Sequence, residues 1–286
     1  MSGVYGAGVL KGMHELGLVK SIEAIYSGSV GSLNAAYLLS GETERGPAVY
    51  WERLQKGFLY PERLLIGTGD LIKNRFFKPI DPSTARNVVD VNYIYNLLAK
   101  DAPVNLEKIK NSPIEFYVKI MDVDNGELEY KKFTDLPILD LLKAAVTIKP
   151  YFFEETFLNN KRYVDATIKE PLGIDYLLQK YPGRKILVVL NEPIKRGLRH
   201  HIKNVIEGLV SSLYPYRISL LKIFLLREHS IRQDIKACLA NKNIFLLYPN
   251  FNGRVRPRTT TPEKLKETFE AGLQDALKVR EFIDCA

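Results

Sequence analysis

Apolar residues form two kinds of run along the chain, and both kinds predict strands. Uninterrupted apolar runs at 185–190 and 243–248 are typical of strands that are buried on both faces. The segment 114–123 instead alternates apolar and polar residues, as a strand with one buried face does. The turn sequence Asp-Asn-Gly at 124–126 then predicts a hairpin, with 127–133 as its returning strand.

Helical periodicity fills most of the remaining sequence. The first helix is expected from Tyr5 to Leu16, with Gly17 as its carboxyl-terminal cap. Further helices are expected at 32–39, 47–56, 92–99, 138–146, 171–179, 202–213, 218–240 and 262–282. Strands that alternate with helices in this way predict a three-layer α/β/α fold, in which helices cover both faces of a mostly parallel central sheet.

The segment 57–88 is the least regular part of the chain. It contains Pro61, Pro79 and Pro82 and a turn-like Gly-Thr-Gly at 67–69. We expect it to form a rim or lid. No linker-like break divides the chain, so a single domain spanning residues 1–286 is predicted.

A cluster of small residues lies between the apolar run 24–26 and a helix-forming segment. The pattern predicts a strand, a tight turn with Ser29 at its apex, and a helix. Such a turn needs neighbours without bulk because its backbone nearly touches itself, and Ser27, Gly28 and Gly31 meet that need. The helix amides and dipole would favour negative charge at the Ser29 oxygen, so Ser29 is a candidate nucleophile. The alternative is a turn whose serines only cap a helix.

An acidic residue ends a strand later in the chain. Asn159 and Asn160 predict the turn of a second hairpin, and its returning strand, 161–165, ends in Asp165. A carboxylate in this position can serve as a base if a nucleophile lies within reach. The alternative is that Asp165 merely caps the next turn, as acids at strand ends commonly do.

Composition narrows the class of protein only in part. Of the 286 residues 46% are hydrophobic, and the formal net charge of +8 favours anionic partners such as a membrane surface. The basic residues are spread out, with no aromatic recognition motif among them, so we expect no nucleic-acid binding. Cys238 and Cys285 are too few for a disulfide framework, which favours a reducing compartment. Asp122 and Asp124 lack a third ligand at useful spacing, so we expect neither a metal nor a cofactor.

We expect neither export through a secretory signal nor a membrane-spanning helix. The first residues lack the basic start and the continuous apolar run of a secretory signal. The longest apolar stretch, 205–226, contains charges that are costly in a bilayer core. We therefore expect a cytoplasmic protein. The helical region 200–240, and Tyr214 to Arg227 above all, is a candidate for peripheral membrane contact, with a core-packing helix as the alternative.

Three blocks of the chain resemble the patatin-like phospholipases, a family of lipid acyl hydrolases. They are Gly3-Val4-Tyr5-Gly6-Ala7-Gly8, then Ser27 to Gly31 followed by Ser32-Leu33-Asn34-Ala35-Ala36, and finally Tyr163-Val164-Asp165-Ala166-Thr167 with Glu170-Pro171-Leu172. The resemblance covers most of the chain and implies the patatin-like α/β/α fold. It also implies a phospholipid or other acyl ester as substrate, and a dyad of Ser29 and Asp165 that needs no histidine.

The family pattern also assigns an oxyanion hole. In the family, a loop of the form G-G-G-x-[RK]-G supplies it, and an elbow G-x-S-x-G carries the nucleophile. The resemblance places Gly3 at the last glycine of that loop, and Gly28, Val30 and Gly31 in the elbow around Ser29.

The chain departs from this pattern at three places. Ser27 replaces the first elbow glycine, and Ala166 replaces the glycine after the acid, where a positive φ would strain it. The triple glycine and its strand are absent before Gly3, which indicates a start assigned to an internal methionine or a truncation. An alternative function is therefore a catalytically impaired relative that binds lipid or a protein partner.

A Ser-His-Asp triad is the alternative mechanism. Ser29 and Asp165, followed by His200, His201 or His229, have the chain order of α/β-hydrolases. None of these histidines lies in a short loop after a strand, so solvated or packing roles are the preferred interpretation.

Overall fold

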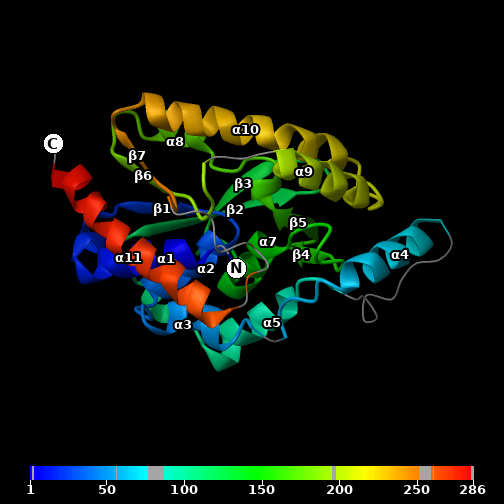
Figure 1. Cartoon of the computed structure of the whole chain (residues 1–286), viewed down its shortest axis with the longest axis horizontal. Helices are drawn as coiled ribbons and strands as arrows, with labels where there is room; N and C mark the ends of the chain where they lie inside the picture. The colour runs from blue at the N-terminus through cyan, green and yellow to red at the C-terminus, as the bar shows by residue number, and fades with distance from the viewer. Residues whose placement is uncertain are drawn as a thin grey trace.

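The computed structural model describes residues 1, 3–55, 57–76, 87–194, 198–250, 259 and 261–284. Helices α8, α9 and α10 cover one side of the central sheet, and α1, α2, α3, α7 and α11 cover the other (Figure 1). The α/β prediction with helices on both sides is thus confirmed. The helices are α1 (Val4–Glu15), α2 (Val30–Leu39), α3 (Arg45–Glu52), α4 (Arg63–Phe76), α5 (Val91–Asn96), α6 (Leu106–Lys110), α7 (Ile138–Val146), α8 (Ile174–Lys180), α9 (Leu198–Ser211), α10 (Leu220–Ala240) and α11 (Pro262–Asp284).

The strands β1 to β5 form a mixed five-stranded sheet and β6 and β7 a separate two-stranded one, with more antiparallel pairing than the mostly parallel sheet that was predicted. Strands β1 and β2 are parallel, as are β6 and β7, whereas β2–β3, β2–β5 and β4–β5 are antiparallel. Antiparallel neighbours need only a short turn between them, and the two predicted hairpins supply such turns. The strands are β1 (Ala24–Ser27), β2 (Glu115–Asp122), β3 (Leu128–Lys132), β4 (Thr156–Leu158), β5 (Lys161–Asp165), β6 (Ile186–Val189) and β7 (Ile244–Leu247).

The strands β1 and β5 lie end to end along one edge of β2. β1 pairs with residues 115–118 of β2 and β5 with residues 120–122, while β3 pairs with 117–121 and so occupies the opposite edge. β1 runs parallel to β2 and β5 antiparallel, so their carboxyl ends face each other. The last pairs are Ser27 with Val118 and Asp165 with Ile120. This topology places the residues that follow β1 beside the end of β5.

The helices α1 and α11 approach each other closely through glycines. A Cβ added to Gly8 would lie 2.1 Å from the carbonyl oxygen of Phe269, and one added to Gly272 would lie 2.2 Å from that of Tyr5. Gly8 and Gly272 therefore let the two helix backbones meet. Gly17 ends this helix with φ +71°, which confirms the predicted cap.

The predicted lid segment is only partly described. α4 extends from the body of the molecule (Figure 1), and residues 77–86, with Pro79 and Pro82, lie outside the described residues. The sequence analysis missed this helix because Gly67 and Gly69, which are usual in turns, lie inside it. A lid role for 57–88 stays a prediction. Among the helices in the described part of the chain, none has the length and apolarity needed to cross a bilayer.

Candidate active site

Ser29 is held in a backbone conformation that is rare for a residue with a side chain. It has φ 53° and ψ −141° and precedes the first residue of α2. A non-glycine residue pays a steric penalty of about 1–3 kcal/mol in such a region and keeps it only where the surroundings enforce it. Gly28 is part of that enforcement, since a Cβ there would lie 2.8 Å from Cγ2 of Thr167. Ser29 thus stands at the apex of a strained strand-to-helix turn, as predicted.

Asp165 is fully buried at the end of β5. Its Oδ1 accepts hydrogen bonds from the backbone amide of Thr167 at 2.9 Å and from the Thr167 hydroxyl at 2.7 Å. Asp165 is therefore the cap of the 3₁₀ turn η4 (Ala166–Ile168), as the alternative interpretation of this residue expected. Within the described part of the chain, Oδ2 has no hydrogen-bond partner at standard geometry. One carboxylate oxygen is thus left over by the cap.

The structure brings the side chains of Ser29 and Asp165 together. Burial raises the pKa of the Asp165 carboxyl above its ordinary value. The nearby Ser29 side chain, two hydrogen bonds from Thr167 and the charge of Arg227 oppose this rise. The contact between Ser29 and Asp165 falls short of standard hydrogen-bond geometry, but it is close enough to act on this pKa. Such contacts are often long before substrate binds.

Gly3 lies against the turn that carries Ser29. A Cβ added to Gly3 would lie 2.5 Å from a methyl carbon of Val30 and 2.4 Å from the hydroxyl of Tyr50, so only glycine fits there. Asn34 fixes this contact, because its Nδ2 donates to the Gly3 carbonyl at 2.8 Å and its Oδ1 accepts from Tyr50 at 2.9 Å. The start of the chain and the amino terminus of α2 therefore surround Ser29 from one side.

The comparison with known families falls on the part of the chain that holds this geometry. Residues 1–178 match the family model described as patatin-like phospholipase, which is more than half of the chain. The chain belongs to the patatin-like phospholipase family. This membership identifies its general activity class as lipid acyl hydrolysis. No curated protein sequence matches the chain.

The two departures from the patatin-like pattern within the matched region fit without strain. Ser27 donates to Ser32 at 3.0 Å, and a Cβ added to Gly31 would remain 4.0 Å from that of Ser27. The expectation that Gly31 is needed to relieve crowding is therefore wrong, because the turn is open at that position. Ala166 begins η4 and is not among the described residues with positive φ, so the alanine is not strained.

Arg227 and Glu207 join the patatin-like site from helices beyond the matched residues. Arg227, on α10, has a side chain only 19% exposed, and its Nη1 lies 3.9 Å from Oε2 of Glu207 on α9. Arg227 was one end of the candidate membrane face, for which a core-packing helix was the alternative; its side chain is mostly buried, as that alternative expects, and its charge acts on the pKa of Asp165. Its spacing of three residues from the buried Phe224 was the available signal.

No histidine takes part in the contacts described for Asp165. Its side-chain partners are Ser29, Thr167 and Arg227, whereas His201 and His229 are exposed on α9 and α10.

We assign no role at this site to a cysteine or to a metal ion. Cys238 is a buried free cysteine, and burial raises its pKa to about 12. Cys285 lies outside the described residues. No group of His, Cys, Asp and Glu side chains in the described ranges could hold a metal ion.

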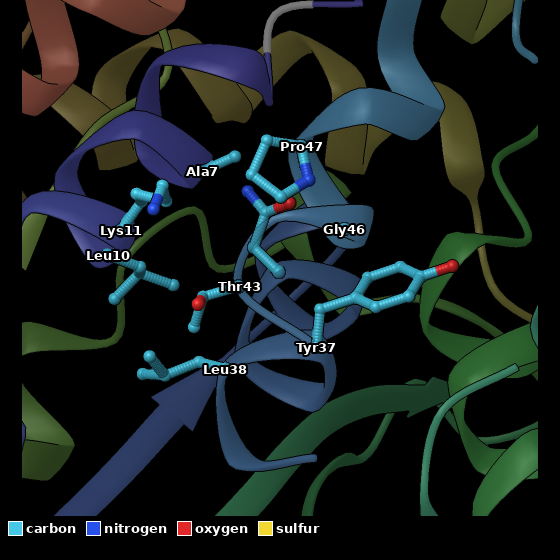
Figure 2. A pocket seen from close by; sticks show the side chains of 9 residues that line it. Ala7, Leu10, Lys11, Tyr37, Leu38, Thr43, Gly46 and Pro47 are labelled. Carbon is cyan, nitrogen blue, oxygen red and sulfur yellow. The ribbon is translucent and has the colours of Figure 1, made fainter. Parts of the chain in front are cut away.

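A small pocket lies between α1, α2 and α3. Side chains of α1, α2 and α3 line it, among them Lys11, Tyr37 and Pro47 (Figure 2). Its cavity volume of about 10 Å³ matches a single water molecule. Neither Ser29 nor Asp165 lines this pocket, so we do not assign it to substrate.

Proposed function

We propose that this protein hydrolyses the acyl ester bond of a phospholipid or related lipid, with Ser29 as nucleophile and Asp165 as general base. Asp165 takes the hydroxyl proton while the Ser29 oxygen attacks the ester carbonyl. Asp165 passes this proton to the departing alcohol, and the acyl group remains on Ser29 as an ester. Asp165 then activates water, which releases the fatty acid and restores the serine.

Charge that develops on the carbonyl oxygen needs backbone donors. Val30 is the first residue of α2, so its amide has no acceptor within the helix and is the natural donor. Removal of one such donor costs enzymes about 2.7–4 kcal/mol. Gly3, Gly28 and Gly31 are proposed to shape the same hole, with Gly3 held in place by Asn34.

One observation carries this proposal. Ser29, in its strained backbone conformation, meets a buried carboxylate that has an oxygen to spare. A helix-capping serine would gain nothing from such strain, since capping needs ordinary backbone geometry. The impaired-binder alternative loses much of its motive because Ser27 and Ala166 both fit.

Hydrolysis of 4-nitrophenyl butyrate tests the proposal. We expect Ser29→Ala to lower kcat at least ~1,000-fold and Asp165→Asn to lower it ~100- to 10,000-fold. Ser21→Ala and Asp101→Asn change exposed residues of the same types and are the matched controls, with rates within about twofold of the parent protein. Equal rates in all five proteins would leave the non-catalytic alternative in place.

A further inference from the structure

The helix α9 buries polar side chains and exposes apolar ones, which is the reverse of an ordinary surface helix. Its buried face carries Asn204 and Glu207, which are 5% and 3% exposed, and Ser211, which is 1% exposed. Its outer face carries Ile202 and Ile206, which are 49% and 53% exposed. A surface helix normally turns its apolar stripe toward the core, so this arrangement needs a reason.

The outer stripe is continuous. Leu209 is 53% exposed and continues the spacing of Ile202 and Ile206 along one side of the helix. The neighbouring α10 adds Leu225 and Leu226, which are 42% and 51% exposed. Gly208 brings the two helices together, since a Cβ there would lie 3.0 Å from Cδ1 of Leu221 and 3.1 Å from Cβ of Phe224. We call these five exposed side chains the α9–α10 apolar face.

The polar inner face is explained by the site beneath it. Glu207 accepts a hydrogen bond from Tyr151 and is paired with Arg227, whose charge acts on Asp165. Within the described residues, the buried Ser211 hydroxyl on the same face has no hydrogen-bond partner. The inner face of α9 therefore faces the candidate active site, while none of the described residues covers its outer apolar side chains.

Charge selects the kind of partner that fits this face. Lys203, whose Nζ lies 3.4 Å from Oε1 of Glu207, has a side chain 45% exposed on α9, and Lys222 is exposed on α10, one turn before Leu225 and Leu226. Apolar side chains flanked by lysines match a bilayer interface that carries anionic headgroups. The net charge of +8 favours the same partner.

We propose that the α9–α10 apolar face docks on an anionic phospholipid surface and that α9 thereby places the site beneath it at the source of its substrate. The assignment of lipid as substrate rests on the proposed function, but docking itself does not require catalysis. It differs from the membrane face expected at Tyr214 to Arg227, because Leu220 and Phe224 are buried. The core-packing alternative is correct for those two residues.

Vesicle flotation tests the docking. Vesicles of phosphatidylglycerol and phosphatidylcholine in equal amounts would be mixed with the full chain or with Ile206→Asp, Leu209→Asp or Ile206→Ala. We expect the aspartate variants to bind at least tenfold more weakly and the alanine variant to bind several-fold more weakly. Leu277→Asp is the matched control, because Leu277 is 55% exposed on α11, and it should bind within about twofold of the parent chain. Circular dichroism would show that each variant is folded.

The same flotation experiment can also reject the proposal. The docking face would be rejected if the parent chain did not bind vesicles, or if the Ile206 and Leu209 variants bound them as tightly as the parent chain does. Loss of a dimer in the same variants, without any effect on vesicles, would show a second copy as the occupant instead. Ser29→Ala should bind vesicles as the parent does. If it also kept full ester hydrolysis, the proposed mechanism would fail while the docking stood.

Discussion

Asp165 uses its two carboxylate oxygens for different purposes. Oδ1 closes the turn η4 through Thr167, and Oδ2 is left for the Ser29 side. Full burial makes the ionised form expensive, so the pKa is raised, and this is the direction that makes a carboxylate a better base. The cap fixes the carboxylate in place, and the burial gives it the basicity that proton transfer needs.

The pH dependence of hydrolysis follows from this raised pKa. The reaction needs ionised Asp165, so kcat/KM should fall as the pH is lowered through the pKa of Asp165 in the free enzyme. Because burial raises that pKa, the midpoint of the acid limb should lie above the ordinary Asp value of about 4. Thr167→Val removes one donor to the carboxylate and should move the midpoint upward by about one pH unit.

Thr167→Ser is the matched control for this prediction. It keeps the hydroxyl that donates at 2.7 Å and should leave the acid limb in place. An acid limb at the ordinary Asp value, or one that is the same in the valine and serine variants, would contradict the role given to Asp165.

At the scale of elements, the close contact between α1 and α11 depends on the absence of side chains. Gly8→Ala would place a Cβ 2.1 Å from the Phe269 carbonyl oxygen and should lower the free energy of unfolding by about 1–3 kcal/mol. Gly69→Ala, in α4, has no atom within 4 Å of the new Cβ and should raise that free energy by about 0.5–1 kcal/mol. Urea unfolding of both variants measures the difference, and equal midpoints would contradict the packing.

The element scale also shows where sequence patterns stop. The periodicity of α9 predicts a helix correctly, but it would place Ile202, Ile206 and Leu209 in the core, whereas they are exposed. Period gives the two faces of a helix, and only the tertiary surroundings decide which face is buried. In α9 the polar face is the buried one, and there Glu207 is paired with Arg227.

At the scale of the whole molecule, the site exists because two distant strands end at one place. Turn chemistry was enough to place Ser29 at a strand-to-helix turn and Asp165 at a strand end, since each occupies a recognisable local pattern, while their catalytic roles stay proposals. Both hairpins were predicted correctly. The prediction of a mostly parallel sheet, however, did not take into account that hairpin strands are antiparallel. The role of Thr167 could not be predicted from local patterns, and the spacing of Arg227 from Phe224 indicates only that it faces inward, because both roles depend on contacts made only in the folded chain. The single domain and the cytoplasmic location stay predictions.

Covalent labelling with a fluorophosphonate tests the central claim most directly, because the probe reacts only with an activated serine. The account predicts one adduct per chain on Ser29, no adduct on Ser29→Ala and much slower labelling of Asp165→Asn. Ser32→Ala is the nearest control and should still be labelled at Ser29, since Ser32 is buried and bonded to Ser27. An adduct on Ser27 or Ser32, or equal labelling with and without the Asp165 carboxylate, would contradict the account.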